Sequence, residues 1–290
     1  ASSPPGAGAG SAASPNAPDR AHGSAREGGA AHHDGPAHQD GSPGEAGAPP
    51  KVVTDGQDGP SPQTRIPLRG ARRLTAERLS RSHAEIPAAA AWTAADASRL
   101  LELRELVAAR SPGLHVTPLA VLLRLCISAL AGFPLLNSSY DHEHGEVVIP
   151  PAVHLGVATQ THHGLLVPVL RDAQHRSISD IAAELARITS AAREGTIDAS
   201  LLSGSTFTVS NYGAFGIDGG VALVNPPEAA ILGVGAIRAR PWVAGDDVVV
   251  RPVVELSLAF DHRVCDGGDA GGFLRRLADL VEHPELTIAD

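Results

Sequence analysis

Only two large aliphatic residues, Val52 and Val53, occur in the first 64 positions of this chain of 290 residues. Ala, Gly, Pro or Ser fills 42 of these 64 positions. A stretch of this composition cannot bury enough apolar surface to offset the conformational entropy lost on ordering. We therefore expect residues 1–64 to form a disordered Ala/Gly/Pro-rich linker and residues 65–290, rich in Leu, Val, Ile and Ala, to form the folded domain.

The net charge, the apolar runs and the cysteines limit which partners and which cell compartment the sequence is compatible with. The net charge is −9, and no basic stripe carries interleaved aromatic residues, so we expect no nucleic-acid partner. The longest apolar run, residues 118–133, contains Arg124 and is too short for a membrane span. Cys126 and Cys265 form neither a disulfide framework nor a zinc spacing, which favours a reducing cytosol.

Several segments have the periodicity and end signals of helices. Residues 65–83 predict a short extended piece followed by a basic helix, and residues 96–110 predict a helix capped by Asp96. Residues 116–134 predict a buried helix with Thr117 as N-cap and Pro118 at its first position. Residues 177–195 predict a helix that stops at Gly195, and a last helix runs from the glycines after Asp266 to about residue 282.

Strands are predicted between these helices by alternating or continuous apolar residues, at 154–161, 164–170, 206–212, 229–235 and 248–262. Because helices and strands are interspersed without a regular βαβ order, we expect an α/β fold in which helices cover a mixed sheet. The segment 141–146 is interpreted as the polar tip of a hairpin. Its two histidines, with His154 farther on, could bind a metal, but we predict no metal site.

The residues with the clearest chemical potential lie in FDHRVCDGG, residues 260–268. His262 ends an apolar strand, Asp266 follows four residues later, and two glycines allow a tight backbone turn. A histidine near neutral pKa can act as a general base, and a carboxylate can fix its geometry. Spacing alone also allows a solvated histidine in an ordinary turn. We interpret Cys265 as a small, partly buried thiol and not as a nucleophile.

The HRVCDGG segment matches the His-x-x-x-Asp-Gly signature of the dihydrolipoamide acyltransferases, the E2 cores of 2-oxo acid dehydrogenase complexes, and of their relative chloramphenicol acetyltransferase. Four further blocks resemble E2 sequences in the family's order: 117–139, 154–172, 205–220 and 225–235. The resemblance covers the chain from about Arg65 to its C-terminus. It implies a chloramphenicol acetyltransferase-like fold over residues 65–290, with the Ala/Gly/Pro-rich linker as the tether of an E2 chain.

The resemblance also implies roles for individual residues. His262 would be the general base that takes the proton from coenzyme A, Ser210 would donate to the oxyanion, and Asp266 would hold local geometry. Coenzyme A contacts would come from positions that resemble Arg104, Thr117, Ser210, Asn211, Gly235 and Ile237. Without the resemblance, Ser210 is an ordinary strand hydroxyl, and Arg104 could equally be a solvated helix residue.

The same resemblance implies a homotrimer with active sites between subunits, assembled into a larger core of 24 chains. The lipoyl group would be carried on a domain not present in this chain, and modules upstream would bind the E1 and E3 components. The sequence blocks favour a branched-chain acyl group. The alternatives are an acetyl or succinyl E2, an antibiotic O-acetyltransferase of the same fold, and a scaffold without activity. Intact His262, Asp266 and Ser210 argue against the scaffold.

Overall fold

The computed structural model describes residues 64–162 and 164–288. Nearly all of the predicted linker, residues 1–63, lies outside the described residues. The helices are α1 (Gly70–Glu85), α2 (Ser98–Arg110), α3 (Pro118–Leu130), α4 (Ile178–Glu194) and α5 (Gly267–Glu282). The strands are β1 (Ala88–Asp96), β2 (Ser139–Asp141), β3 (Glu146–Val148), β4 (Leu155–Thr161), β5 (Gly164–Leu166), β6 (Val169–Leu170), β7 (Phe207–Asn211), β8 (Ala230–Val234), β9 (Arg238–Ala244) and β10 (Asp247–Asp261). The expected α/β fold with a mixed sheet is confirmed.

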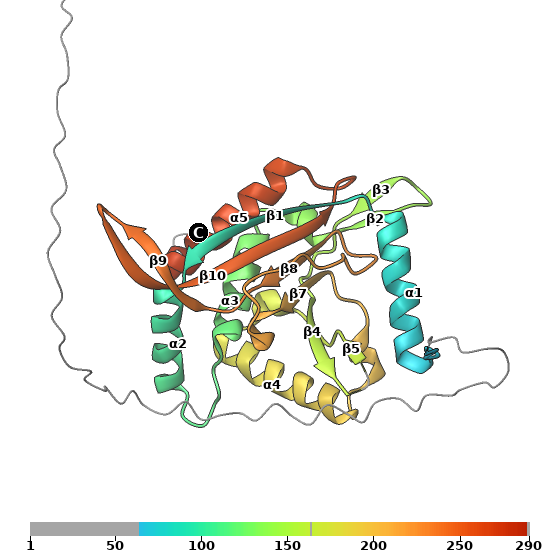
Figure 1. Cartoon of the computed structure of the whole chain (residues 1–290), viewed down its shortest axis with the longest axis horizontal. Coiled ribbons are helices and arrows are strands. Elements are labelled where there is room, and N and C mark those ends of the chain that lie inside the picture. Colours follow the sequence, from blue (N-terminus) through green and yellow to red (C-terminus); the bar gives the residue numbers. More distant parts are fainter. Residues whose placement is uncertain (1–63, 163, 289–290) are drawn as a thin grey trace, which may run out of the picture. The chain divides into compact units, whose positions relative to one another are not determined.

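An eight-stranded mixed sheet forms the centre of the described region (Figure 1). Its strands run in the order β1-β10-β8-β7-β4-β5, while β6 pairs with β4 and β9 pairs with β10. Strand β7 is parallel to both of its neighbours, β4 and β8, and the other pairs are antiparallel. The β2–β3 hairpin forms a separate two-stranded sheet, which confirms the hairpin predicted around residues 141–146.

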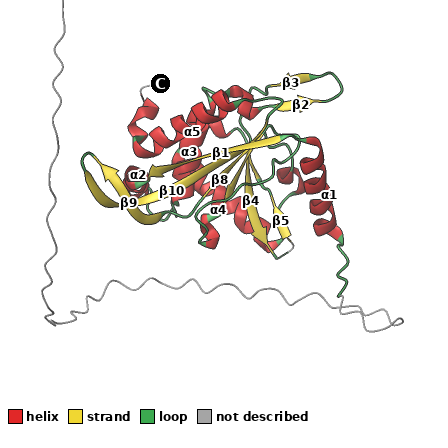
Figure 2. Ribbon diagram, turned by 45° about the horizontal axis from the view of Figure 1, so that its top comes forward, coloured by secondary structure: helices red, strands yellow, loops and turns green. Residues whose placement is uncertain are grey.

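Helices α2, α3, α4 and α5 lie together against one face of the sheet (Figure 2). The core between them takes Leu232, Leu256 and Leu258 from the sheet, and Leu100 and Phe273 from the helices. The opposite face carries only a small apolar cluster around Val224, Ile231 and Ala259. Helices α2 to α5 do not cover this second face, so it can carry polar side chains. We call it the open face of the sheet.

Local signals place helices α3 and α4 where they were predicted. Thr117 accepts a hydrogen bond from the Ala120 backbone N–H at 3.2 Å, and Pro118 begins α3. Ser177 and Asp180 form a capping box at the start of α4, which ends at Gly195 with φ of 72°. Such side-chain caps satisfy N–H groups that have no partner inside a helix. None of the helices in the described residues combines the length and apolar character needed to cross a bilayer.

Several predicted elements differ from the structure. The sequence patterns did not predict β1, because its run AAAAWTAAD is poor in strand-forming residues, yet it pairs with β10 over its whole length. The hairpin strand β9 was not predicted either. Asp96 was expected to cap α2, but it ends β1 and Ala97 is the N-cap; the Asp96 carboxylate instead accepts from the Ser98 N–H at 2.9 Å. The predicted strand 164–170 is two strands, because Pro168 has no N–H.

One carboxyl group is buried in the loop between β7 and β8. Glu228 is only 2% exposed. Its Oε1 accepts hydrogen bonds from the Ser205 hydroxyl at 2.5 Å and the Asn225 amide at 2.6 Å, while its Oε2 has no hydrogen-bond partner in the described part of the chain. Burial raises the pKa of Glu228 to about 7, against the lowering effect of the hydrogen bonds from Ser205, Thr208 and Asn225.

Glu228 therefore makes stability fall as pH rises. Between pH 4.5 and about pH 7 the carboxyl is ionised in the unfolded chain and protonated in the folded one. Above about pH 7 this difference lowers the free energy of unfolding by on the order of 3 kcal/mol. We expect Glu228→Gln to unfold at a higher temperature than the wild type at pH 8, with little difference at pH 4.5. Thermal unfolding at both pH values measures this. Glu143→Gln, at an exposed position, is the control, and an unchanged pH dependence in Glu228→Gln would contradict the prediction.

Candidate active site

His262 directly follows the last residue of β10, which is the longest strand of the sheet. Its backbone N–H donates to the Pro87 carbonyl at 3.1 Å, and the N–H of the preceding Asp261 donates to the Ala229 carbonyl at 2.8 Å. The imidazole is exposed, and its centroid lies 5.7 Å from that of the Phe260 ring. These hydrogen bonds fix the backbone at Asp261 and His262, while the side chain of His262 stays accessible to a substrate.

An ion pair between the buried Asp261 carboxylate and the Arg263 guanidinium holds the turn that carries His262. The Asp261 side chain is nearly fully buried and accepts from the Arg263 backbone N–H at 3.0 Å, from Nε at 2.9 Å and from Nη2 at 2.6 Å. Hydrogen bonding to Asp261 raises the pKa of Arg263. The Arg263 guanidinium also lies 4.5 Å from the centroid of the Tyr140 ring and 3.3 Å from His142 Nε2, so it joins the turn to the β2–β3 hairpin.

Neither Asp261 nor Arg263 was among the predicted site residues. The signal that could have found them is an acid and a base flanking the histidine directly after an apolar strand. Two charges at such a place need partners, because an unpaired buried charge is costly.

Asp266 is occupied by the start of α5. Its Oδ1 accepts from the backbone N–H groups of Gly268 at 2.7 Å and Asp269 at 3.2 Å, and the Asp269 carboxylate accepts from the Asp266 N–H. This is a complete capping box. Cys265, between the turn and the helix, is buried, and burial raises the pKa of its thiol to about 12. Cys265 was predicted to be partly buried, and the structure buries it more deeply, at 2% exposure.

Ser210 lies in β7 and is far from His262 in the same chain. It pairs with Gly233 of β8, which in turn pairs with Ser257 of β10, so the three residues form one row across the sheet. His262 is five positions beyond Ser257, which is about 17 Å farther along the strand at a rise of about 3.4 Å per residue. One chain therefore does not bring the serine and the histidine together.

The other predicted coenzyme contacts fall into two groups. Asn211, Gly235 and Ile237 lie at the carboxyl ends of the adjacent strands β7 and β8, where the Asn211 side chain accepts from the Gly213 N–H at 2.9 Å. Gly235 admits no side chain, because a Cβ there would lie 1.6 Å from the Asp218 carbonyl oxygen. Arg104 is on α2, 3.0 Å from Glu105, and Thr117 caps α3, so these two belong to the helical layer.

The three histidines considered as metal ligands have other partners. His144 Nδ1 lies 2.8 Å from Asp141, and His142 Nε2 faces Arg263. His154 Nδ1 accepts from the Asp172 N–H at 3.0 Å. Within residues 64–162 and 164–288, no three His, Cys, Asp or Glu side chains are grouped as metal ligands would be.

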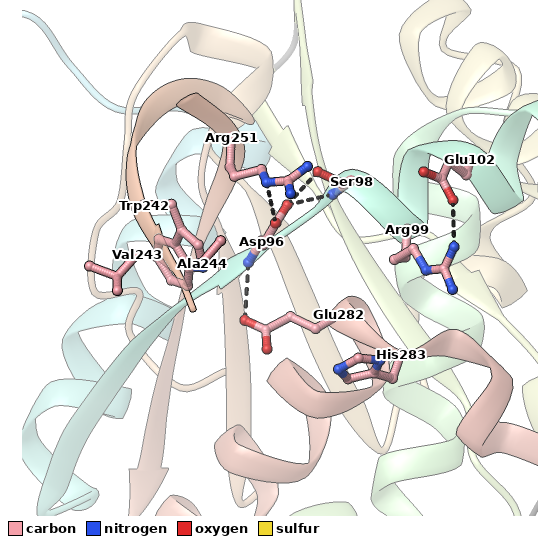
Figure 3. A pocket seen from close by; sticks show the side chains of 10 residues that line it. All are labelled: Asp96, Ser98, Arg99, Glu102, Trp242, Val243, Ala244, Arg251, Glu282 and His283. Carbon is pink, nitrogen blue, oxygen red and sulfur yellow. Dashed lines mark hydrogen bonds and ion pairs between the residues drawn. The ribbon is translucent and has the colours of Figure 1, made fainter. Parts of the chain in front are cut away.

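A surface pocket of about 410 Å³ lies elsewhere (Figure 3). It lies between the start of α2, the β9–β10 hairpin and the end of α5. Asp96, at the end of β1, faces Arg251 in it, with Nε and Oδ2 3.4 Å apart, and Arg99 pairs with Glu102. The His262 turn adjoins Ala88 at the opposite end of the same strand. Because its charged residues are paired and the turn is distant, this pocket does not define the candidate active site.

The sequence and the fold are similar to those of an acyltransferase family. The family model described as 2-oxoacid dehydrogenases acyltransferase (catalytic domain) matches residues 60–289. This chain belongs to that family, as its sequence blocks predicted.

Curated relatives and a solved structure agree with this assignment. The lipoamide acyltransferase component of the branched-chain alpha-keto acid dehydrogenase complex of Pseudomonas aeruginosa is 41% identical over 76% of this chain and 52% of its own length. The acetyltransferase component of the acetoin cleaving system of Bacillus subtilis is 35% identical over 77% of this chain and 56% of its own length. The chain thus spans about half the length of these relatives. The dihydrolipoamide acetyltransferase structure of Azotobacter vinelandii has a TM-score of 0.74 at 33% identity, covering 77% of this chain and 93% of that chain.

The capping geometry predicts how α5 responds to change at Asp266. Asp266→Ala removes the acceptor for two N–H groups and should lower the free energy of unfolding by about 1 kcal/mol. Asp266→Asn keeps an acceptor oxygen and should stay within about 0.5 kcal/mol of the wild type. Denaturant unfolding of both variants checks this, with Asp246→Ala, in the exposed β9–β10 turn, as the control. Equal losses in the Ala and Asn variants would assign the role of Asp266 to its charge.

Proposed function

We propose that residues 65–290 are the catalytic domain of a dihydrolipoamide acyltransferase, which moves an acyl group between a lipoyl thiol and coenzyme A. In this proposal His262 is the general base, Ser210 donates to the oxyanion, and Asp266 holds the start of α5 beside the His262 turn. The observation that carries the proposal is the exposed imidazole of His262 on a rigid strand end, within a chain that belongs to the acyltransferase family.

The solved Azotobacter vinelandii relative supports these three assignments. The description of that structure concerns the role of a serine, a histidine and an asparagine in the catalytic mechanism. Those residues are separated by 52 and then four positions, and Ser210, His262 and Asp266 have the same two spacings here. The asparagine and Asp266 differ in charge, but both residue types are strong helix N-caps. The substitution is therefore compatible with a role for Asp266 in holding local structure.

The chemistry needs one base and one hydrogen-bond donor. An imidazole nitrogen of His262 takes the proton from the coenzyme A thiol, and the thiolate attacks the thioester carbonyl of the acylated dihydrolipoyl group. The Ser210 hydroxyl donates to the resulting oxyanion. Collapse of the tetrahedral intermediate breaks the bond to the lipoyl sulfur, which takes the proton back from the imidazolium. General base catalysis of this kind typically contributes about 10²- to 10⁴-fold, and an oxyanion donor about 10²- to 10³-fold.

The separation of Ser210 from His262 supports an active site built from two copies of the chain. The row Ser210–Gly233–Ser257 and the His262 turn lie at different heights of the sheet, so one subunit presents the serine and another the histidine. The resemblance implies a homotrimer, in which each interface forms one such site, and trimers that assemble into a core of 24 chains. The solved cubic core of a pyruvate dehydrogenase multienzyme complex, 33% identical over 77% of this chain, supports such an assembly.

The coenzyme and partner assignments follow from the same resemblance. Asn211, Gly235 and Ile237 at the strand ends, with Arg104 and Thr117 from the helical layer, are the proposed coenzyme A contacts. The lipoyl group would reach the site on a separate domain, and the E1 and E3 components would bind outside residues 65–290. For the acyl group we propose a branched chain, as in the Pseudomonas aeruginosa relative. Acetyl transfer, as named for the Bacillus subtilis relative, and succinyl transfer are the alternatives.

Removing the proposed base should abolish transfer while keeping the assembly. We expect His262→Ala to lower kcat for transfer from isobutyryl-CoA to dihydrolipoamide by about 10²- to 10⁴-fold. The matched control, His175→Ala, alters another exposed histidine and should keep wild-type activity. The same assay with acetyl- and succinyl-CoA ranks the acyl groups by kcat/KM. Unchanged transfer in an assembled His262→Ala protein would place the chemistry at another residue, whereas no transfer by the assembled wild type would leave the chain as a scaffold.

A site shared between subunits also predicts complementation. Ser210→Ala chains retain His262, and His262→Ala chains retain Ser210, so an equal mixture assembled at random should regain about a quarter of wild-type activity in a symmetric oligomer. Co-expression with two affinity tags and tandem purification provides the mixed particles. Mixing His262→Ala with the Ser210→Ala/His262→Ala double variant is the control and should regain none. Failure of the first mixture to exceed its parents would mean that both residues act within one chain or that one is dispensable.

A further inference from the structure

Tyr212 occupies an unusual place next to the row of Ser210, Gly233 and Ser257. It follows β7 directly, and its N–H donates to the Val234 carbonyl at 2.8 Å, which continues the pairing with β8. Its ring then lies over Gly233 on the open face. A Cβ added to Gly233 would be 2.6 Å from the Tyr212 ring, 3.0 Å from its hydroxyl oxygen and 2.3 Å from Ser257 Oγ. Only glycine leaves space for this ring between the two serines.

The loop after Tyr212 also approaches the ring. A Cβ added to Gly220 would be 3.4 Å from the Tyr212 ring, so Gly220 lies close to it. The Ser257 hydroxyl donates to the Gly220 carbonyl oxygen at 2.5 Å and so anchors the loop to β10. Gly220 and Gly233 together confine the phenol.

The hydroxyl groups of Ser210, Tyr212 and Ser257 have few acceptors to which they can donate. Each hydroxyl has one proton to donate and two lone pairs that accept. Ser257 has committed its proton to the Gly220 carbonyl, so toward Tyr212 it can only accept. The Tyr212 hydroxyl oxygen is buried and has no hydrogen-bond partner within the described residues. The Tyr212 hydroxyl lies against Gly233, which pairs with Ser210 on one side and with Ser257 on the other, so both serines are neighbours of the phenol. Burial raises the pKa of Tyr212, while the Ser210 and Ser257 hydroxyls lower it.

We propose that Tyr212 is a positioning residue for Ser210, because its phenol is held beside the serine and can donate a hydrogen bond to Ser210 Oγ when Ser210 turns its own proton to the oxyanion. The proposal rests on the proposed role of Ser210 and adds a second residue to that role. A hydroxyl that accepts one hydrogen bond while it donates another is polarised into a stronger donor. Tyr212 would thus stabilise the transition state without touching the substrate.

The test is a double-mutant cycle on the assembled full chain. Tyr212→Phe removes only the hydroxyl and keeps the packed ring, so the fold and assembly should be retained. We expect kcat for acyl transfer to fall about tenfold while KM for both substrates changes little, because the interaction is made only in the transition state. In the Ser210→Ala background the same change should have no further effect on kcat, since residues that act together are non-additive.

Ser190→Ala is the control, because it deletes one hydroxyl group from an exposed position of α4, outside the proposed site. It should leave kcat unchanged. An unchanged kcat in Tyr212→Phe, or an equal fold loss in the Ser210 and Ser210→Ala backgrounds, would overturn the role of Tyr212. These outcomes are distinct from failure of the proposed function, in which the wild type shows no transfer or His262→Ala shows full transfer.

Discussion

The buried carboxylate of Asp261 is the interaction on which the His262 turn depends. Its side chain accepts hydrogen bonds from three nitrogens of Arg263, its N–H donates to Ala229, and its carbonyl accepts from the N–H groups of Val264 and Cys265, both at 3.0 Å. A carboxylate this deep in the protein is tolerated only because the guanidinium neutralises it and satisfies its oxygens. The chain consequently leaves β10 in one fixed direction, with His262 exposed and Asp266 in place to begin α5.

The sheet separates structural and chemical roles by face. On the helical side, Leu232, Leu256 and Leu258 pack into the main core. On the open side, the same strands carry Ser210, Gly233 and Ser257 in one row, and the ring of Tyr212 rests on that row. Because side chains alternate along a strand, the rigid packing of one face fixes the polar groups on the other. The polar row is therefore positioned by a core that it does not belong to.

The segment between β7 and β8 packs closely against the open face of the sheet. Gly233 and Gly235 have no room for a side chain, since Tyr212 and the Asp218 carbonyl occupy the space where a Cβ would lie. Glu228, from the same segment, is buried with Ser205 and Asn225 and retains an oxygen without a partner in the described residues. Because burial raises the pKa of this carboxyl to about 7, the stability of this segment depends on pH near neutrality, in contrast to the apolar core behind the sheet.

The sequence by itself determined the elements that are encoded within a few residues. Caps at Thr117, Ser177 and Asp266 define where α3, α4 and α5 begin, and the His-x-x-x-Asp-Gly spacing singled out His262. Tertiary structure decided the rest. Strand β1 exists because it pairs with β10, whose residues lie more than 150 positions away, and the partners of Asp261 and Tyr212 depend on the same pairing and on loops. Caps and periodicity are local, whereas strand register and the neighbours it creates are properties of the folded chain.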